Sequence, residues 1–273
     1  MSDKNLPHPL QDEKTYRAYE ALSASDIKLL AESYGHYAHK RDYPQDYNYT
    51  VALRYGTIIH AAVLEPERFA EEFVVPPAIN KRTKAGKEEW AMWESENADK
   101  FAVTEEELEK AEIIRHHCFK NPKAKELLTN GTAEVPLTWD EEVNGTDFHF
   151  KARADYLKDY GDTRLIIDLK TVQEASEEYF TRSVVKWGYA IQAYHYTQGF
   201  GKDQDAHFIW VVVEKNPPYG CAIYSASPQV LEYGRKRREK GLANYLEGEE
   251  GVGLMLPYPE QITAISLPKW LPQ

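Results

Sequence analysis

The period of the hydrophobic pattern changes near residue 131, and this change limits the folds open to the chain. Before that point apolar residues recur at helical spacing, as in TVALRYGTIIHAAVL at 50–64. Afterwards 132–139 and 147–157 alternate apolar and polar residues, which is typical of half-buried strands. Asn144-Gly145 lies between them and is a strong hairpin signal. The pattern predicts an N-terminal helical part followed by a sheet.

The rest of the chain extends this sheet and covers it with helices. A third strand is predicted at 163–172, after the turn around Gly161, and two more at 206–215 and 220–226. Helices are predicted from the N-cap Ser176 to about residue 200, with a break at Gly188, and again from Ser227-Pro228. We therefore expect an α/β fold with a mixed central sheet flanked by helices, and N-terminal helical elements packed on it.

This pattern divides the chain into one large domain with two tails. We expect residues 1–20 to be a flexible segment and 21–273 to form a single domain. Within it, 21–130 is the helical part, 131–250 the α/β core and 251–273 a C-terminal tail.

Two helix starts are clear in the N-terminal part, and a long loop is expected between them. Ser23 or Ser25 is a candidate N-cap, and Thr104 with Glu107 forms a capping-box pattern. Residues 65–103 are mixed in character and predict an exposed, mobile loop region.

Composition and charge exclude several classes of protein. Cys118 and Cys221 are the only cysteines, which argues against a disulfide framework and against any four-cysteine metal site. No apolar run is long enough for a membrane span, and the polar N-terminus does not resemble a signal peptide, so we expect a cytoplasmic protein without a membrane partner. A net charge of −11 weighs against nucleic-acid binding unless the basic residues are clustered.

Two basic clusters do occur. One consists of Lys81, Arg82, Lys84 and Lys87, and the other spans 235–238 in a predicted helix. Lys81, Arg82 and Lys84 are candidates for gripping DNA phosphates, although a solvated charge run is an equally good interpretation.

The strand LIIDLKTV at 165–172 carries opposite charges in an otherwise apolar run. Asp168 and Lys170 are two residues apart and so project from one face. Counting back through the predicted hairpin places Asp155 opposite Asp168, and facing carboxylates are unfavourable without a cation between them. Magnesium or manganese would suit such oxygen ligands, and Lys170 could then orient a water or stabilise charge on a phosphate. An ion pair at a solvent-facing edge is the alternative.

Three further residues are candidates only in combination with these. Gln192 and Tyr196 are four apart and lie on one face of a predicted helix. His60 lies within GTIIH. Taken alone, each of these residues is more often part of a packed core than of an active site.

The ordered set GTIIH, ARADY, IIDLK and QAYHY resembles the motifs of the PD-(D/E)xK nuclease superfamily. Within it, the chain is most similar to the RecE-type exonucleases of phages and prophages, also called exonuclease VIII. The similarity runs from LSASDIKLL to PYPEQITAISLPKW, nearly the whole chain. Ala154 stands where the motif has proline before Asp155. The resemblance implies a restriction-endonuclease-like core.

The resemblance also implies an activity and the roles of individual residues. The activity is Mg²⁺-dependent 5′-to-3′ exonuclease action on linear double-stranded DNA, with Mn²⁺ as a substitute, leaving 3′ single-stranded tails for recombination. Asp155, Asp168 and the carbonyl of Leu169 would bind metal, with His60 as a ligand or a neighbour of the ligands. Lys170 would activate water, and Gln192 and Tyr196 would position the phosphate and the strand.

The same resemblance implies partners. Such enzymes form ring-shaped homo-oligomers around DNA and pass the exposed strand to a RecT-type annealing protein. A ring could line its channel with the basic clusters and leave its outer surface acidic.

Other functions remain open at this point. A related class of nucleases holds an iron–sulfur cluster with four cysteines, which this chain lacks. A catalytically inactive DNA-binding or scaffold protein, or a structure-specific endonuclease, could use the same fold. The presence of Asp155, Asp168 and Lys170 favours an active enzyme.

Overall fold

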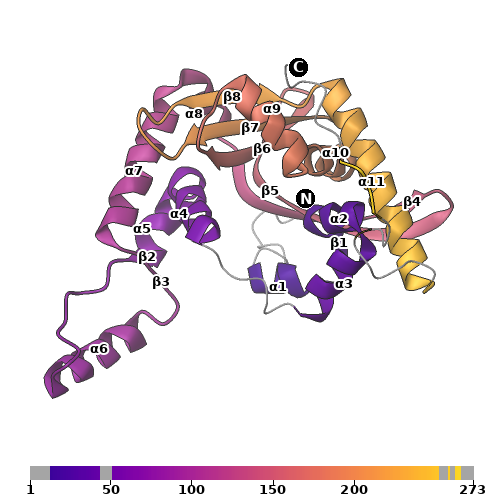
Figure 1. The fold of residues 1–273 in the computed structure, drawn as a ribbon. Helices are drawn as coiled ribbons and strands as arrows, with labels where there is room; N and C mark the ends of the chain where they lie inside the picture. The colour runs from indigo at the N-terminus through magenta and orange to yellow at the C-terminus, as the bar shows by residue number, and fades with distance from the viewer. Residues whose placement is uncertain (1–12, 44–50, 252–257, 259–261, 266–273) are drawn as a thin grey trace, which may run out of the picture.

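A mixed sheet forms the centre of the molecule (Figure 1). The computed structural model describes residues 13–43, 51–251, 258 and 262–265. The six-stranded sheet has the order β1-β5-β6-β7-β8, and β4 also pairs with β5. The strands are β1 Leu22–Ser23, β4 Thr132–Val143, β5 Thr146–Tyr160, β6 Thr163–Val172, β7 Asp205–Glu214 and β8 Cys221–Ser225. The β1–β5 and β6–β7 pairs are parallel and the others antiparallel, which confirms the predicted mixed sheet.

Helices cover both faces of this sheet. One face packs against α2 (Ala24–Glu32), α9 (Glu177–Lys186), α10 (Tyr189–Phe200) and α11 (Pro228–Glu249) around a core that includes Ile27, Phe150 and Trp210. The other packs against α4 (Val51–Leu64), α7 (Glu105–Lys120) and α8 (Pro122–Leu127), with Ile59, Ile114 and Leu169 in the core. The remaining helices are α1 (Glu13–Ala18), α3 (Tyr34–Asp42), α5 (Pro66–Glu72) and α6 (Lys84–Glu96).

Local sequence signals explain where several helices begin. Ser23 caps α2 and forms a capping box with Asp26, and Thr104 does the same for α7 with Glu107. The break predicted at Gly188 separates α9 from α10, and Gly188 has a φ of 64°, which favours glycine. The hairpin turn at Asn144-Gly145 is present, with positive φ at both residues.

The pairing of β4 with β5 is interrupted in the middle. The ladder includes Ala133↔Tyr156 and Val135↔Ala154 but omits the position between them, where Glu134 and Asp155 face each other. Regular alternation would keep both pairs on one face, yet Ala133 and Tyr156 belong to the core around Ile59, whereas Val135 and Ala154 belong to the core around Phe150. The two strands therefore change face together at this point.

A second, smaller pairing supports an arm that the sequence did not reveal. Strands β2 (Phe73–Val74) and β3 (Phe101–Ala102) pair with each other outside the main sheet, and α6 lies at the end of the extension between them (Figure 1). We call residues 75–100 the arm. The prediction of a loop across 65–103 is therefore wrong, because Pro66 opens α5 and Thr83 caps α6.

The basic cluster at 235–238 is only partly a free surface. Arg238 is buried and makes a bidentate ion pair with Glu141 on β4, at 2.7 and 2.8 Å. Arg235 pairs with Glu232 and Glu239 along the helix. The idea that the whole cluster lines a DNA channel is therefore not supported for these two residues.

The ends of the chain are described in part. Of the segment 1–20, predicted to be flexible, residues 1–12 lie outside the described residues and Glu13–Ala18 form α1. Most of the predicted tail 251–273 also lies outside them. In the parts of the chain that the structure describes, no helix combines the length and apolar character that crossing a bilayer requires.

The Arg238–Glu141 pair gives a prediction about stability. Replacing Arg238 with Met should lower the free energy of unfolding by ~2 to 3 kcal/mol, because Glu141 loses its partner in a mostly buried position. Arg235→Met on the exposed side of the same helix is the matched control and should change stability little. Urea unfolding of both variants measures the difference, and equal stability would show that the buried pair contributes nothing.

Candidate active site

A cleft of about 810 Å³ lies against the middle of β5. Elements far apart in sequence contribute to it, from α1 and α2 through α4, β4, β5 and β6 to α10. The predicted site residues that line it are His60, Asp155, Lys170, Gln192 and Tyr196. Asp168 and Leu169 are buried at its inner side, each 1% exposed.

Asp168 is the centre of a buried polar group. Its Oδ2 lies 2.5 Å from Lys170 Nζ, and its Oδ1 accepts a hydrogen bond of 2.7 Å from Gln192 Nε2. Burial raises the pKa of Asp168 against the opposing charge of Lys170. Burial would lower the pKa of Lys170, but the charges of Asp168 and Asp155 outweigh it and raise that pKa. The predicted shared face of Asp168 and Lys170 thus exists, and it is buried rather than a solvent-facing edge.

Asp155 lies where β5 and β6 stop pairing. The ladder between them ends at Tyr156↔Ile167, one pair short of the expected contact between Asp155 and Asp168. Instead, Leu169 N–H donates to Asp155 Oδ2 at 2.9 Å. The carboxylate replaces the strand partner of that amide, which keeps Asp155 close to the Asp168–Lys170 pair and turned towards the cleft.

His60 connects α4 to the same point. Its Nε2 lies 2.8 Å from the carbonyl oxygen of Leu169, which can only accept, so Nε2 carries the proton. In the neutral ring Nδ1 is then an acceptor, and it faces Asp155 Oδ2 at 3.6 Å. Two acceptors that face each other need a proton or a cation between them.

Glu134 is a site residue that the sequence analysis missed. One donor atom from each of His60, Glu134 and Asp155 lies within 4.8 Å of the others. Glu134 has a φ of 51°, in the left-handed region that is costly for a residue with a side chain. A signal was available, since the register counted from Asn144-Gly145 places Glu134 opposite Asp155, again as two facing carboxylates.

Burial and two charged neighbours determine the pKa of Glu134. Burial raises the pKa of Glu134 to about 7, Asp155 adds to this, and Arg153 opposes it. Arg153 Nε lies 2.8 Å from Glu134 Oε2. Tyr196 donates its hydroxyl to the carbonyl oxygen of Arg153 at 2.9 Å, so in this structure it holds β5 in place beside Asp155.

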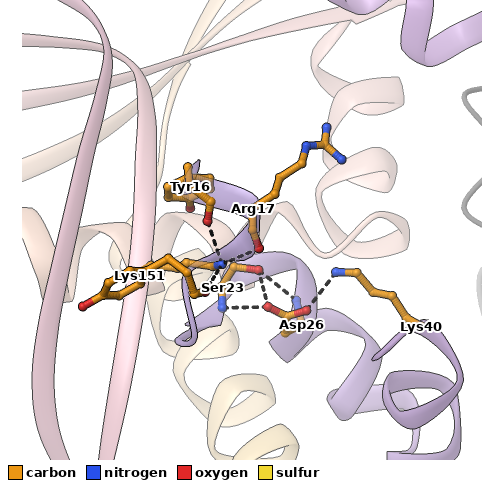
Figure 2. A network of polar contacts seen from close by, with 7 residues as sticks. Tyr16, Arg17, Ser23, Asp26, Lys40 and Lys151 are labelled. Carbon is orange, nitrogen blue, oxygen red and sulfur yellow. Dashed lines mark hydrogen bonds and ion pairs between the residues drawn. The ribbon is translucent and has the colours of Figure 1, made fainter. Parts of the chain in front are cut away.

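Helix α1 is fastened to the sheet beside the cleft (Figure 2). The buried Lys151 on β5 donates to the backbone carbonyls of Tyr16, Arg17 and Tyr19, at 2.9, 3.3 and 2.6 Å. These bonds satisfy carbonyl groups at the C-terminal end of α1. They bring Tyr16 to the wall of the cleft, where its ring lies 5.1 Å from the Arg153 guanidinium.

The predicted DNA-binding residues lie elsewhere. Lys81 and Arg82 precede α6, and Lys84 is its first residue, all exposed and none lining the cleft. Lys81 Nζ lies over the Trp90 ring, and Lys84 is 93% exposed with Glu88 4.0 Å away. The structure therefore does not bring these residues together with the acidic site.

The acidic site fits a divalent metal ion. The carboxylates of Asp155 and Glu134 and the nearby carbonyl of Leu169 supply the oxygen ligands that Mg²⁺ or Mn²⁺ prefers, and the facing acceptor of His60 adds one imidazole nitrogen. The predicted ligand Asp168 lies deeper, next to Lys170 and Gln192. Its role as a ligand stays a prediction, as do the roles expected for the other site residues.

Comparison with known proteins adds a family and a related fold. Residues 23–252 match the family model described as "PDDEXK-like domain of unknown function (DUF3799)". A crystal structure described as a "Putative exonuclease" from Eubacterium rectale aligns with a TM-score of 0.60 and 16% identity, covering 88% of this chain and 87% of that chain. The structure of SSO0001 aligns with a TM-score of only 0.39 and 11% identity, over 84% of this chain and 81% of that chain. No curated protein matches the chain.

The acidic site predicts stabilisation by metal. Saturating Mg²⁺ or Mn²⁺ should raise the melting temperature, since an ion at 100 times its Kd adds about 2.7 kcal/mol to the free energy of unfolding. Glu134→Gln should lose at least half of this gain, because it removes a charged oxygen from the group within 4.8 Å. Glu65→Gln is the matched control, since Glu65 lines the same cleft outside this group and pairs with Arg68. Equal gains in both variants would exclude Glu134 from metal binding.

Proposed function

The chain belongs to the PDDEXK-like domain family named above, and from its site we propose that it is a nuclease that hydrolyses DNA phosphodiester bonds with a divalent metal ion. The observation that carries this proposal is that Asp155 and Lys170 line one cleft and Asp168 is buried beside them, in the order along the chain that the superfamily motif requires. The aligned structure from Eubacterium rectale supports the fold alone.

Each residue of the site has a task in this reaction. Asp155, with Glu134 and His60, would hold Mg²⁺, which would polarise a phosphate oxygen and lower the pKa of a bound water. Lys170, fixed by Asp168, would hold the attacking water and face the charge that develops on the phosphate. Gln192 holds Asp168 from the opposite side, so that Lys170 keeps its orientation.

We further propose the finer activity that the RecE-type resemblance implies. The substrate would be the end of linear double-stranded DNA, degraded from 5′ to 3′, and the product a 3′ single-stranded tail. A homo-oligomeric ring would keep the enzyme on DNA, and a RecT-type annealing protein would receive the tail for recombination. The motif series and its order along the chain support this part.

A catalytically inactive binding protein is the alternative on the same fold. Burying Asp168 beneath the partly exposed Lys170 is costly, and such ion pairs are often replaceable by apolar residues without loss of stability. An intact buried pair beside further carboxylates therefore favours an enzyme.

Digestion of plasmid DNA tests the activity. The linear form should be degraded with Mg²⁺ and left intact with EDTA, while the closed circular form should resist. Lys170→Met should lower turnover by at least about a hundredfold, because a group that faces developing charge contributes on that scale. Cutting of closed circles would identify an endonuclease, and binding without cutting would identify the inactive alternative.

We also propose that the arm contacts duplex DNA outside the cleft. The side chains of Lys81, Arg82 and Lys84 are exposed and lie in a chain whose net charge is strongly negative, so they offer a local attraction for phosphates. They lie on a segment apart from the sheet, so they would touch the duplex at a distance from the cut (Figure 1).

Replacing Lys81, Arg82 and Lys84 with Ala tests this contact. The apparent KM for linear DNA should rise, and the salt dependence of binding should become flatter by about one unit of slope per lost contact. The maximal rate should change far less than in Lys170→Met. A triple variant with unchanged affinity and slope would make the arm an ordinary solvated surface.

A further inference from the structure

We propose that Lys28 on α2 binds a phosphate group of the DNA strand that enters the cleft. This inference rests on the proposed nuclease function and adds a residue to the site. None of the four motifs includes Lys28, although it lies in the segment LSASDIKLL where the similarity begins. Its segment reaches the site because β1 pairs with β5 and leads directly into α2.

Lys28 is the exception among the cations of the cleft. Lys170 is paired with Asp168, Arg153 with Glu134, and Arg68 with Glu65 and Glu72. Among the residues that the structure describes, Lys28 has no carboxylate within ion-pair distance, and its Nζ has a single polar neighbour, the neutral Oε1 of Gln192 at 3.5 Å. The cleft thus contains one ammonium group whose charge is not matched by a carboxylate partner.

The surroundings of Lys28 keep this group in the cleft. Its side chain passes over Gly188, where an added Cβ would come within 3.0 Å of Lys28 Cγ. Its Nζ lies 5.5 Å from the centre of the Tyr189 ring, and Lys170 Nζ lies 4.9 Å from the same centre. The glycine and the ring fix the half-buried side chain next to the Asp168–Lys170 pair.

The charges near Lys28 favour an anionic ligand. Burial, followed by the positive charge of Lys170, lowers the pKa of Lys28 to about 8, while Asp168 and Asp155 act in the opposite direction. Two ammonium groups beside one aromatic ring repel each other, and a phosphate that contacts both would remove this repulsion. A DNA phosphate is the anion that a nuclease brings to this place.

The same neighbours connect Lys28 to the reaction. Gln192 accepts from Lys28 through Oε1 and donates to Asp168 through Nε2, so its amide connects Lys28 to the carboxylate that pairs with Lys170. A phosphate held by Lys28 would therefore lie at a fixed position relative to Lys170, because Gln192 and Asp168 connect the two lysines. Lys28 would act by positioning the strand, and Lys170 by orienting the water.

Binding of a labelled linear duplex to Lys28→Met tests the proposal. Methionine keeps the unbranched apolar stem and removes the charge. Anisotropy titrations in EDTA, at several salt concentrations, should show roughly tenfold weaker binding and a salt slope smaller by about 0.9, the value for one lost phosphate contact. Lys28→Arg should restore most of the affinity and slope. Lys186→Met, which changes an exposed lysine outside the cleft, should bind like the wild type.

The outcomes separate this proposal from the nuclease function. Melting curves of Lys28→Met first confirm that the variant is folded, and the arginine variant provides the same test with the charge kept. If the wild type cuts linear DNA and Lys28→Met binds with unchanged affinity and slope, the phosphate contact is refuted and the nuclease function stands. If the wild type binds DNA through Lys28 but cuts none, the contact stands and the nuclease function is refuted. A wild type that binds no duplex refutes both.

Discussion

The buried ion pair between Asp168 and Lys170 sets the conditions for the rest of the molecule. Charges in the centre of a sheet are tolerated only if each has partners, because water is not there to solvate them. Asp168 forms an ion pair with Lys170 and accepts a hydrogen bond from Gln192 on α10, and α10 can begin where it does because Gly188 adopts a positive φ. Strand β6, helix α10 and the glycine before it thus act together to compensate the buried charge of Asp168.

The site also depends on irregular backbone at two places. The β5–β6 ladder stops before Asp155, and the β4–β5 ladder is interrupted at Glu134 and Asp155. Each interruption frees a carboxylate from the ordinary alternation of a strand and turns it towards the cleft. In a perfectly regular sheet of the same sequence, strict alternation along each strand would have set the face of these side chains. The acidic group with His60 would then not have formed.

These features separate what the sequence could predict from what it could not. Local rules located the hairpin at Asn144-Gly145, the caps at Ser23 and Thr104, and the shared face of Asp168 and Lys170, because each depends on neighbours in the chain. The interrupted ladders, the arm and the buried Arg238 depend on tertiary contacts. For the last two the sequence predicted something different, namely a loop across 65–103 and a basic cluster at 235–238 that could line a channel. Glu134 lies between these cases, since its register was readable but the backbone distortion that turns it was not.

The arm has a consequence for how such a protein can change over evolutionary time. No residue that lines the cleft belongs to segment 75–100, and the strands at its base pair with each other rather than with the main sheet. The length and the charge of this segment could change in evolution without altering the residues around Asp168. In the proposed nuclease, the contact of the arm with DNA and the hydrolysis in the cleft could therefore change independently of each other.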